Sequence, residues 1–244
     1  MSQELYHHGI LGMKWGIRRY QNKDGSLTDK GRKRLERSGF KNSNISVSKD
    51  QTLYRVSGSD EELGSERKYA ALTKGEADIY KKYADLGYLG KEAKENGKIY
   101  ELSSNRDLKV AQAHDVIEEL LSTVGDRKVS EMTNRDVYSY DKKYTKFLSK
   151  IGNKTVSDVV FNADKYNRKG QMLYTRRGYG SEATTQMFQA AMANLKDYRV
   201  GTKTLGNLSR KGYDIAVDIE DYYSQSWAKT PVIILNPKDS VKKK

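Results

Sequence analysis

The segment from Tyr166 to Tyr179 interleaves aromatic and cationic side chains. Its tyrosines can stack on the bases of a single-stranded nucleic acid, and its lysine and arginines can neutralise phosphates. Side chains of these kinds in alternation indicate non-specific nucleic-acid binding. The formal net charge of +13 adds a generic, salt-sensitive attraction to polyanions. The same charge is also explained by a solvated surface that keeps the protein in solution.

Three acidic residues, Asp218, Glu220 and Asp221, form a second group that could do chemistry. A carboxylate held in a cleft can stabilise positive charge that develops in a transition state. Acidic residues this close together are also common in solvent-exposed turns. The sequence leaves both interpretations open.

A metal site is not expected. His7 and His8 are adjacent, and adjacent side chains of an extended segment point in opposite directions. The third histidine, His114, lies far along the chain, and there is no cysteine. Zinc sites need several such ligands together. The lack of cysteine also excludes disulfides.

Membrane association is not expected either. The first residues lack the basic stretch and apolar run of a secretory signal. No stretch approaches the roughly 20 apolar residues that are needed to span a bilayer. Hydrophobic residues make up 36% of the 244 residues, and there are 18 tyrosines against four phenylalanines. We therefore expect a soluble protein with a modest core and a tyrosine-rich boundary.

Strand patterns occur early and late in the chain, and helical patterns lie between them. The strands are expected at residues 52–56, 68–73, 98–102, 108–111, 213–218 and 231–237. This order predicts an α+β fold with a split mixed sheet and inserted helices. Residues 1–49 are basic and glycine-rich, and they predict a separate segment that ends in a polar linker. Residues 50–240 are expected to form the α+β domain.

Thr73 and Glu76 fit a capping box at the start of a helix. In such a box the Thr73 side chain accepts a hydrogen bond from the Glu76 N–H, and the Glu76 carboxylate reaches back. The helix would carry Ala77, Tyr80 and Ala84 on one face.

The N-terminal zone contains the motif YHHGILGMKWGIRRYQNKDGSLT, from Tyr6 to Thr28. This motif resembles a segment found near the ends of tailed-bacteriophage head-region and prophage proteins, including proteins that are otherwise unrelated. A segment attached to different domains implies a docking tag rather than a catalytic part. The resemblance implies a protein of the virion or prohead, present in the host cytoplasm during assembly.

Residues 5–28 would then bind phage head or other virion proteins. Trp15, Arg18 and Arg19 are the expected docking residues, because Trp and Arg are common anchors at interfaces. The alternative is that Trp15 packs on the protein's own sheet.

The domain that follows resembles the ADP-ribosyltransferase fold at several places in chain order. Leu53-Tyr54-Arg55 is similar to its first-strand signature, and the stretch from Tyr69 to Ala84 is similar to its second strand and following helix. The stretches 98–102, 107–111, 212–218 and 231–237 are similar to its later strands. The resemblance implies NAD as a possible cofactor and no metal.

The same resemblance places Arg55 and Tyr54 against the NAD pyrophosphate and ribose, with Thr73 and Tyr80 in the same site. Each residue also has a structural explanation. Arg55 could pair with Glu101 or Asp60. Thr73 could act only as a helix cap, and Tyr80 could belong to the core.

The acid that such a site needs is not in its expected place. In many members of the family it lies just before the last strand, where this chain has Trp227-Ala-Lys-Thr230. Lys229 would repel the positive charge that develops in the transition state. Asp218, Glu220 or Asp221 could act as the acid if the loop from Tyr222 to Thr230 folds back.

Three functions follow from these patterns. The first is a virion- or prohead-associated structural or cargo protein with an inactive ADP-ribosyltransferase-like domain. The second is an active NAD-dependent transferase that modifies a host protein. The third is a basic nucleic-acid-binding protein that is packaged with the genome.

Overall fold

The structure is a computed structural model that describes residues 19–22, 24–59, 63, 66–132, 142–166, 184, 188, 199–224 and 228–244. The chain divides into two compact units. One contains residues 1–40 and 120–198, and the other contains residues 41–119 and 199–244. We call them the helical unit and the sheet unit. The division at residues 40 and 41 differs from the boundary at 49 and 50 that the composition favoured.

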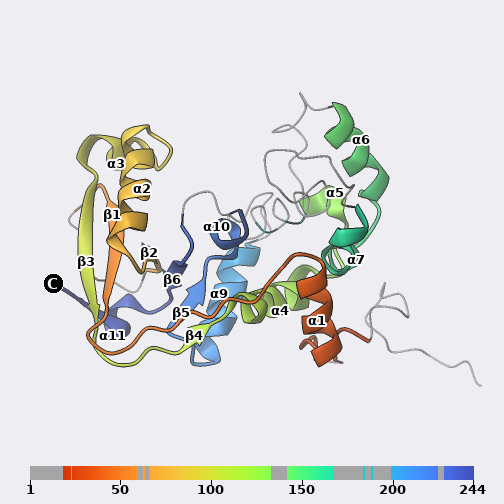
Figure 1. The fold of residues 1–244 in the computed structure, drawn as a ribbon, viewed down its shortest axis with the longest axis horizontal. Helices are drawn as coiled ribbons and strands as arrows, with labels where there is room; N and C mark the ends of the chain where they lie inside the picture. The colour runs from red at the N-terminus through yellow and green to blue at the C-terminus, as the bar shows by residue number, and fades with distance from the viewer. Residues whose placement is uncertain are drawn as a thin grey trace, which may run out of the picture. The chain divides into compact units, whose positions relative to one another are not determined.

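The described part of the sheet unit contains one mixed sheet in the order β4-β5-β6-β2-β1-β3-β7 (Figure 1). Neighbouring strands are antiparallel, except that β4 and β5 are parallel. The strands are β1 (Thr52–Ser57), β2 (Lys68–Ala71), β3 (Lys98–Ser104), β4 (Val110–Ala111), β5 (Ile215–Val217), β6 (Pro231–Ile234) and β7 (Val241–Lys243). The late strands β5 and β6 lie between the early strands β4 and β2, and the late strand β7 pairs with β3, so both ends of the chain build the sheet. This confirms the α+β class.

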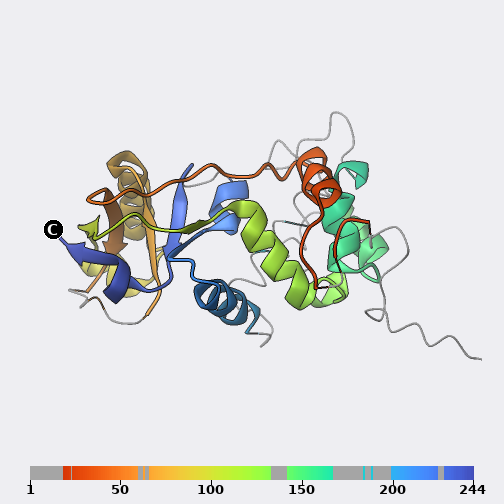
Figure 2. The ribbon, with the colours of Figure 1, turned by 90° about the horizontal axis from the view of Figure 1, so that it is seen from below.

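Six of these strands lie where the sequence predicts them, although several are shorter. The seventh strand, β7, was not predicted, because three of residues 241–244 are lysines and show no strand pattern. It forms the edge of the sheet beside the C-terminus (Figure 2). Lysines at Lys242 and Lys243 suit an edge strand, since charged side chains discourage pairing with another chain.

Helices cover parts of both units. The sheet unit carries α2 (Lys74–Asp85), α3 (Lys91–Asn96), α9 (Val200–Arg210), α10 (Ile219–Ser224) and α11 (Pro237–Ser240). The helical unit carries α1 (Asp29–Arg37), α5 (Val129–Met132), α6 (Lys142–Ile151), α7 (Val156–Phe161) and a 3₁₀ turn (Ala163–Tyr166). The boundary between the units falls within α4 (Ala113–Val124). In the sheet unit α2 and α3 pack against β1, and α10 packs against β6 (Figure 1).

The polar run from Lys41 to Lys49, expected as a linker, is hydrogen-bonded to the start of α4. The Ser43 hydroxyl accepts from the N–H of Ala113 at 2.8 Å. The Asn42 side chain accepts from the N–H of His114 at 2.9 Å. These side chains satisfy N–H groups that a helix leaves unpaired in its first turn. The polar side chains of this run therefore cap a helix, whereas their composition had predicted a linker.

The second half of the N-terminal motif has a local structural role. Gln21 and Leu27 form a β-bridge around a turn in which Gly25 has a φ of 87°. The N–H of Ser26 donates to the Asp24 carboxylate at 2.9 Å. Thr28 then caps α1 by accepting from the N–H of Gly31 at 3.0 Å. Residues 20–28 therefore form a small hairpin that leads directly into a helix.

The α1 helix is fixed to the helical unit by polar contacts. Arg34 donates two hydrogen bonds to Asp164, at 2.5 and 3.0 Å. The Ser38 hydroxyl donates to the carbonyl of Phe161 at 2.9 Å. This helix was not predicted from the sequence, because its basic residues were assigned to the docking segment.

An ion pair between Arg106 and Asp214 joins the segments that lead into β4 and β5. Two guanidinium nitrogens donate to the two carboxylate oxygens, each at 2.7 Å. The N–H of Lys109 donates to the same carboxylate at 2.9 Å. The carbonyl of Asp214 accepts from the N–H of Leu235, just after β6. One residue thus ties three neighbouring strands together.

Burial acts to raise the pKa of Asp214. The hydrogen bonds from Arg106 and from the Lys109 N–H, together with the charges of both residues, outweigh it and lower the pKa below its ordinary value of 3.8. The ionised form of Asp214 is therefore the one that the fold stabilises.

We expect Arg106→Ala to reduce the free energy of unfolding at pH 7 by about 2 kcal/mol, because the buried Asp214 carboxylate loses its main partner. Urea denaturation measures this. The lowered pKa means that the stabilisation is present above pH 3.8 and is lost as the pH falls through the folded-state pKa. The difference between Arg106→Ala and the wild type should therefore shrink in acid.

The matched control is Lys203→Ala, which removes an exposed cation from α9. It should change the free energy of unfolding by less than about 0.5 kcal/mol. Equal effects of the two substitutions would contradict a stabilising role for the Arg106–Asp214 ion pair.

Candidate functional site

The three places that the resemblance marks as functional lie on neighbouring strands. Arg55 is in β1, Thr73 follows β2, and residues 229–230 precede β6. β2 lies between β1 and β6 in the sheet. The Thr73 hydroxyl accepts from the N–H of Glu76 at 3.3 Å and caps α2, so its capping role is confirmed.

The Glu76 carboxylate occupies the place just before β6, where the sequence has no acid. Its Oε1 accepts from the N–H groups of Lys229 and Thr230, at 2.7 and 3.0 Å. Its Oε2 accepts from the Thr230 hydroxyl at 2.6 Å. Sequence reasoning assigned Glu76 only a local role, in which its carboxylate would reach back to Thr73. The structure turns it toward a segment about 150 residues further along the chain.

Tyr80 lies one helical turn after Glu76 and contacts α10. Its hydroxyl donates to the Asp221 carboxylate at 2.5 Å. Burial, then the charge of Asp221 and this hydrogen bond, raise the pKa of Tyr80, so it stays protonated as a donor. Thr73, Glu76 and Tyr80 follow one another at spacings of three and four residues. They therefore form a polar stripe on α2 that faces the connection from β5 to β6.

Asp218 lies at the end of β5 and is 7% exposed. Its Oδ1 accepts from the N–H of Glu220 at 3.1 Å, and its own N–H donates to the carbonyl of Pro231 at 3.0 Å. The interpretation as a solvent-exposed turn residue is wrong for Asp218. It caps the short helix α10 from a buried position.

The carboxyl groups of Asp218 and Asp221 resist ionisation. Burial, then the charges of Asp221 and Glu220, raise the pKa of Asp218 to about 8. Burial also raises the pKa of Asp221, although the hydrogen bond from Tyr80 opposes it. Asp218 is therefore largely a neutral acid at pH 7.

Arg55 and Asp218 lie on opposite faces of the sheet. Tyr54 faces Ala71 in register, and Tyr69 faces Ile233, so Tyr54 and Tyr69 share one face. Val217 faces Val232, which faces Ala70, so Asp218, the residue after Val217, alternates to the face of Tyr69. Arg55 alternates with Tyr54 and points to the other face.

On that other face Arg55 lies beside Tyr100, and its guanidinium donates to the backbone carbonyl of Tyr69 at 3.1 Å. Glu101, one suggested ion-pair partner, faces Tyr54 in register and so lies on the opposite side from Arg55. Asp60, the other, lies outside the described residues. The structure therefore brings together Thr73, Tyr80, Asp218 and Asp221, but not Arg55.

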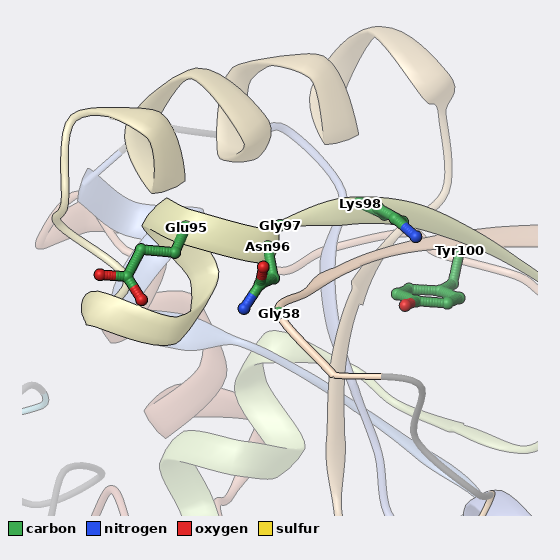
Figure 3. A pocket seen from close by; sticks show the side chains of 6 residues that line it. All are labelled: Gly58, Glu95, Asn96, Gly97, Lys98 and Tyr100. Carbon is green, nitrogen blue, oxygen red and sulfur yellow. The ribbon is translucent and has the colours of Figure 1, made fainter.

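A shallow pocket lies near the ends of β1 and α3, at the start of β3 (Figure 3). It is lined by Gly58, Glu95, Asn96, Gly97, Lys98 and Tyr100. None of the sequence-predicted site residues lines it, although Tyr100 is the neighbour of Arg55. No signal in the sequence singled it out, because its polar residues resemble an ordinary strand start.

Most of the residues that the sequence predicts for docking and for nucleic-acid binding lie outside the described residues. Trp15, Arg18 and residues 167–179 lie outside the described part of the chain. Arg19 is described, and its guanidinium lies 4.8 Å from the centre of the Tyr20 ring. Its backbone carbonyl accepts from the Thr28 hydroxyl at 2.8 Å, so it belongs to the base of the hairpin.

Among the described residues there is no group of three or more His, Asp or Glu that could hold a metal ion. None of the helices in that part of the chain has the length and apolar composition to cross a membrane.

Comparison with known protein families gives a match at the N-terminus. A family of unknown function, DUF7211, matches residues 1–22. No curated protein matches the chain, and no solved structure does. The matched residues end at Asn22, inside the hairpin that precedes α1. The motif and the sheet unit thus belong to separate parts of the chain.

We expect the free energy of unfolding to fall as the pH rises from 4 to 8, because folded Asp218 holds its proton up to about pH 8 and the unfolded residue loses it near 3.8. Asp218→Asn keeps the oxygen that accepts from Glu220 and cannot ionise. It should raise the free energy of unfolding at pH 9 by about 2 kcal/mol and change little at pH 4.

Urea denaturation between pH 4 and pH 9 measures this difference. Glu92→Gln, on the exposed side of α3, is the matched control and should shift stability equally at all pH values. A pH-independent effect of Asp218→Asn would contradict the buried, neutral carboxyl.

Proposed function

We propose that this chain is a structural or cargo protein of a phage virion or prohead, and that its sheet unit is an ADP-ribosyltransferase-like domain without transferase activity. The observation that supports the second part is the Glu76 carboxylate. It contacts residues 229–230, the stretch in which the resembled family carries its acid, and both of its oxygens accept hydrogen bonds there.

A carboxylate that stabilises an oxocarbenium-like state must be ionised and must face the reacting carbon. Glu76 directs its lone pairs to three donors of its own chain. Asp221 is hydrogen-bonded to Tyr80, and Asp218 is buried and neutral at pH 7. These three acids therefore support the fold rather than a developing positive charge.

The position of Arg55 supports the same conclusion. In the resembled family a basic residue of the first strand holds the NAD pyrophosphate. Here Arg55 lies on the opposite face from Tyr69 and Asp218. One NAD molecule could not contact Arg55 and place its ribose beside Asp218 without crossing the sheet.

We expect no release of nicotinamide when the purified protein is incubated with NAD, and no labelled band when host lysate is added with labelled NAD. Both measurements should stay at the level of a sample without protein. Release that is lost in Glu220→Gln or Asp221→Asn, but kept in Asp78→Asn, would instead establish an active transferase with that acid.

The first part of the proposal rests on the N-terminal motif. Its described half folds as a hairpin that leads into α1, and α1 is held by Asp164 and Phe161. Residues that precede the hairpin are thereby attached to a rigid base. Such an attachment suits a segment that binds a partner, because less conformational freedom is lost on binding.

We expect deletion of residues 2–18 to leave the urea denaturation curve unchanged and to abolish association with purified particles. Mass spectrometry of particles from cells that express either form measures the association. Nuclease treatment before purification is the control for retention by nucleic acid. Equal amounts of both forms in the particles would contradict docking through the motif.

A further inference from the structure

The C-terminal half of α2 and the turn after it present several large apolar side chains to solvent. Ile79 is 40% exposed, Leu86 59%, Tyr88 69% and Leu89 39%. Tyr83 is half-buried, and its ring packs edge-on to that of Tyr88, with the centroids 5.7 Å apart. We call these five residues the α2 patch. Apolar side chains gathered in this way are a mark of an interaction surface.

The patch is separate from the faces that α2 uses within its own unit. Ala77 and Ala84 are fully buried, and Glu76 and Tyr80 contact the β5–β6 connection. Ile79, Tyr83 and Leu86 recur at spacings of four and three, so they form a second stripe on the helix. The helix therefore carries an apolar stripe beyond the one that its own fold buries.

The turn that ends the helix extends this stripe. Gly87 and Gly90 have φ values of 89° and 94°, which glycine adopts without strain. They hold Tyr88 and Leu89 next to Leu86 in a short, specified conformation. The N–H of Tyr88 donates to the carbonyl of Tyr83, and the N–H of Gly90 donates to that of Gly87. The exposure of these side chains is thus built into the turn.

The surface of α2 is complementary to itself when two helices run antiparallel. If the two-fold axis passes near Tyr80 and Lys81, Leu86 of one copy lies opposite Gly75 of the other. A side chain added at Gly75 would meet nothing within 4 Å, so the helix is open there to a neighbour's side chain. An open position opposite a projecting leucine suits the packing of two helices.

The charged residues on α2 also favour an antiparallel arrangement of the two helices. In the antiparallel arrangement Asp78 of each copy lies close to Lys82 of the other, and the two-fold axis repeats this contact. In a parallel arrangement Asp78 would lie close to Asp78 of the other copy, and Lys82 close to Lys82, so like charges would repel. Asp78 and Lys82 are both exposed, so both can meet a second copy.

We propose that the α2 patch is the interface through which two copies of this chain associate, with their α2 helices antiparallel about a two-fold axis. Five apolar side chains and one repeated ion pair make a small interface. We therefore expect a concentration-dependent dimer with a dissociation constant on the order of 10 μM. The inference does not depend on the proposed function.

Sedimentation velocity of the full chain between about 1 and 200 μM tests the proposal. The wild type should shift from monomer to dimer across this range. Leu86→Glu should raise the dissociation constant at least tenfold, because it places a charge against the second copy. Lys203→Glu, an exposed charge change on α9, should leave it unaltered. Urea denaturation of each variant verifies that it is folded.

A charge exchange tests the direction of the helices. Asp78→Lys alone should weaken the dimer, because the new lysine of each copy then approaches Lys82 of the other. Asp78→Lys combined with Lys82→Asp should restore it to within about threefold of the wild type. A wild type that stays monomeric at 200 μM would overturn the proposal. So would a dimer that is indifferent to Leu86→Glu, or a combined variant no stronger than Asp78→Lys.

Discussion

The hydrogen bonds of the Glu76 carboxylate connect parts of the chain that lie more than 150 residues apart. They fix the first turn of α2 to the residues that enter β6, and β6 is paired with β2, which directly precedes α2. The sheet can close only when strands from both ends of the chain meet, and contacts of such long range carry the largest cost in loop closure. An ionised acceptor with three donors makes stronger hydrogen bonds than a neutral one. The first turn of α2 thus determines where the last strands join the sheet.

The same contacts limit what the carboxyl groups can do chemically. Structural use of a carboxylate favours saturated hydrogen bonds and exclusion of water, whereas electrostatic catalysis needs an ionised group that faces the substrate. Glu76 and Asp221 accept hydrogen bonds from residues 229–230 and from Tyr80. Asp218 is held differently, since burial and two neighbouring acids keep it protonated near neutral pH. These three carboxyl groups therefore stabilise the fold.

The sequence predicted the α+β class and six strand positions, because apolar alternation and turn residues are local signals. It also predicted the Thr73 cap, whose partner is three residues away. It did not predict that Glu76 reaches Thr230, since a capping box offers that carboxylate a closer partner and only the closed sheet decides between them. The capping role of Asn42 and Ser43 was not predicted for a similar reason. A polar residue that caps a helix far along the chain cannot be told from a linker residue by its type alone. The opposite faces of Arg55 and Asp218 follow from strand register, which single-chain patterns do not specify.

On α2, helical spacing alone did not predict which apolar residues are buried and which are exposed. Residues 77, 80 and 84 were expected to share one face of the helix, and the structure buries Ala77 and Ala84. Residues 79, 83 and 86 obey the same spacing, but they end at a turn that keeps Leu86, Tyr88 and Leu89 in water. Two glycines with positive φ are needed for that turn, so the exposure is specified by the chain and does not result from a frayed helix end. Apolar surface left in water gives the isolated chain no stability. A second copy that covers this surface would account for both the glycines and the side chains that they present.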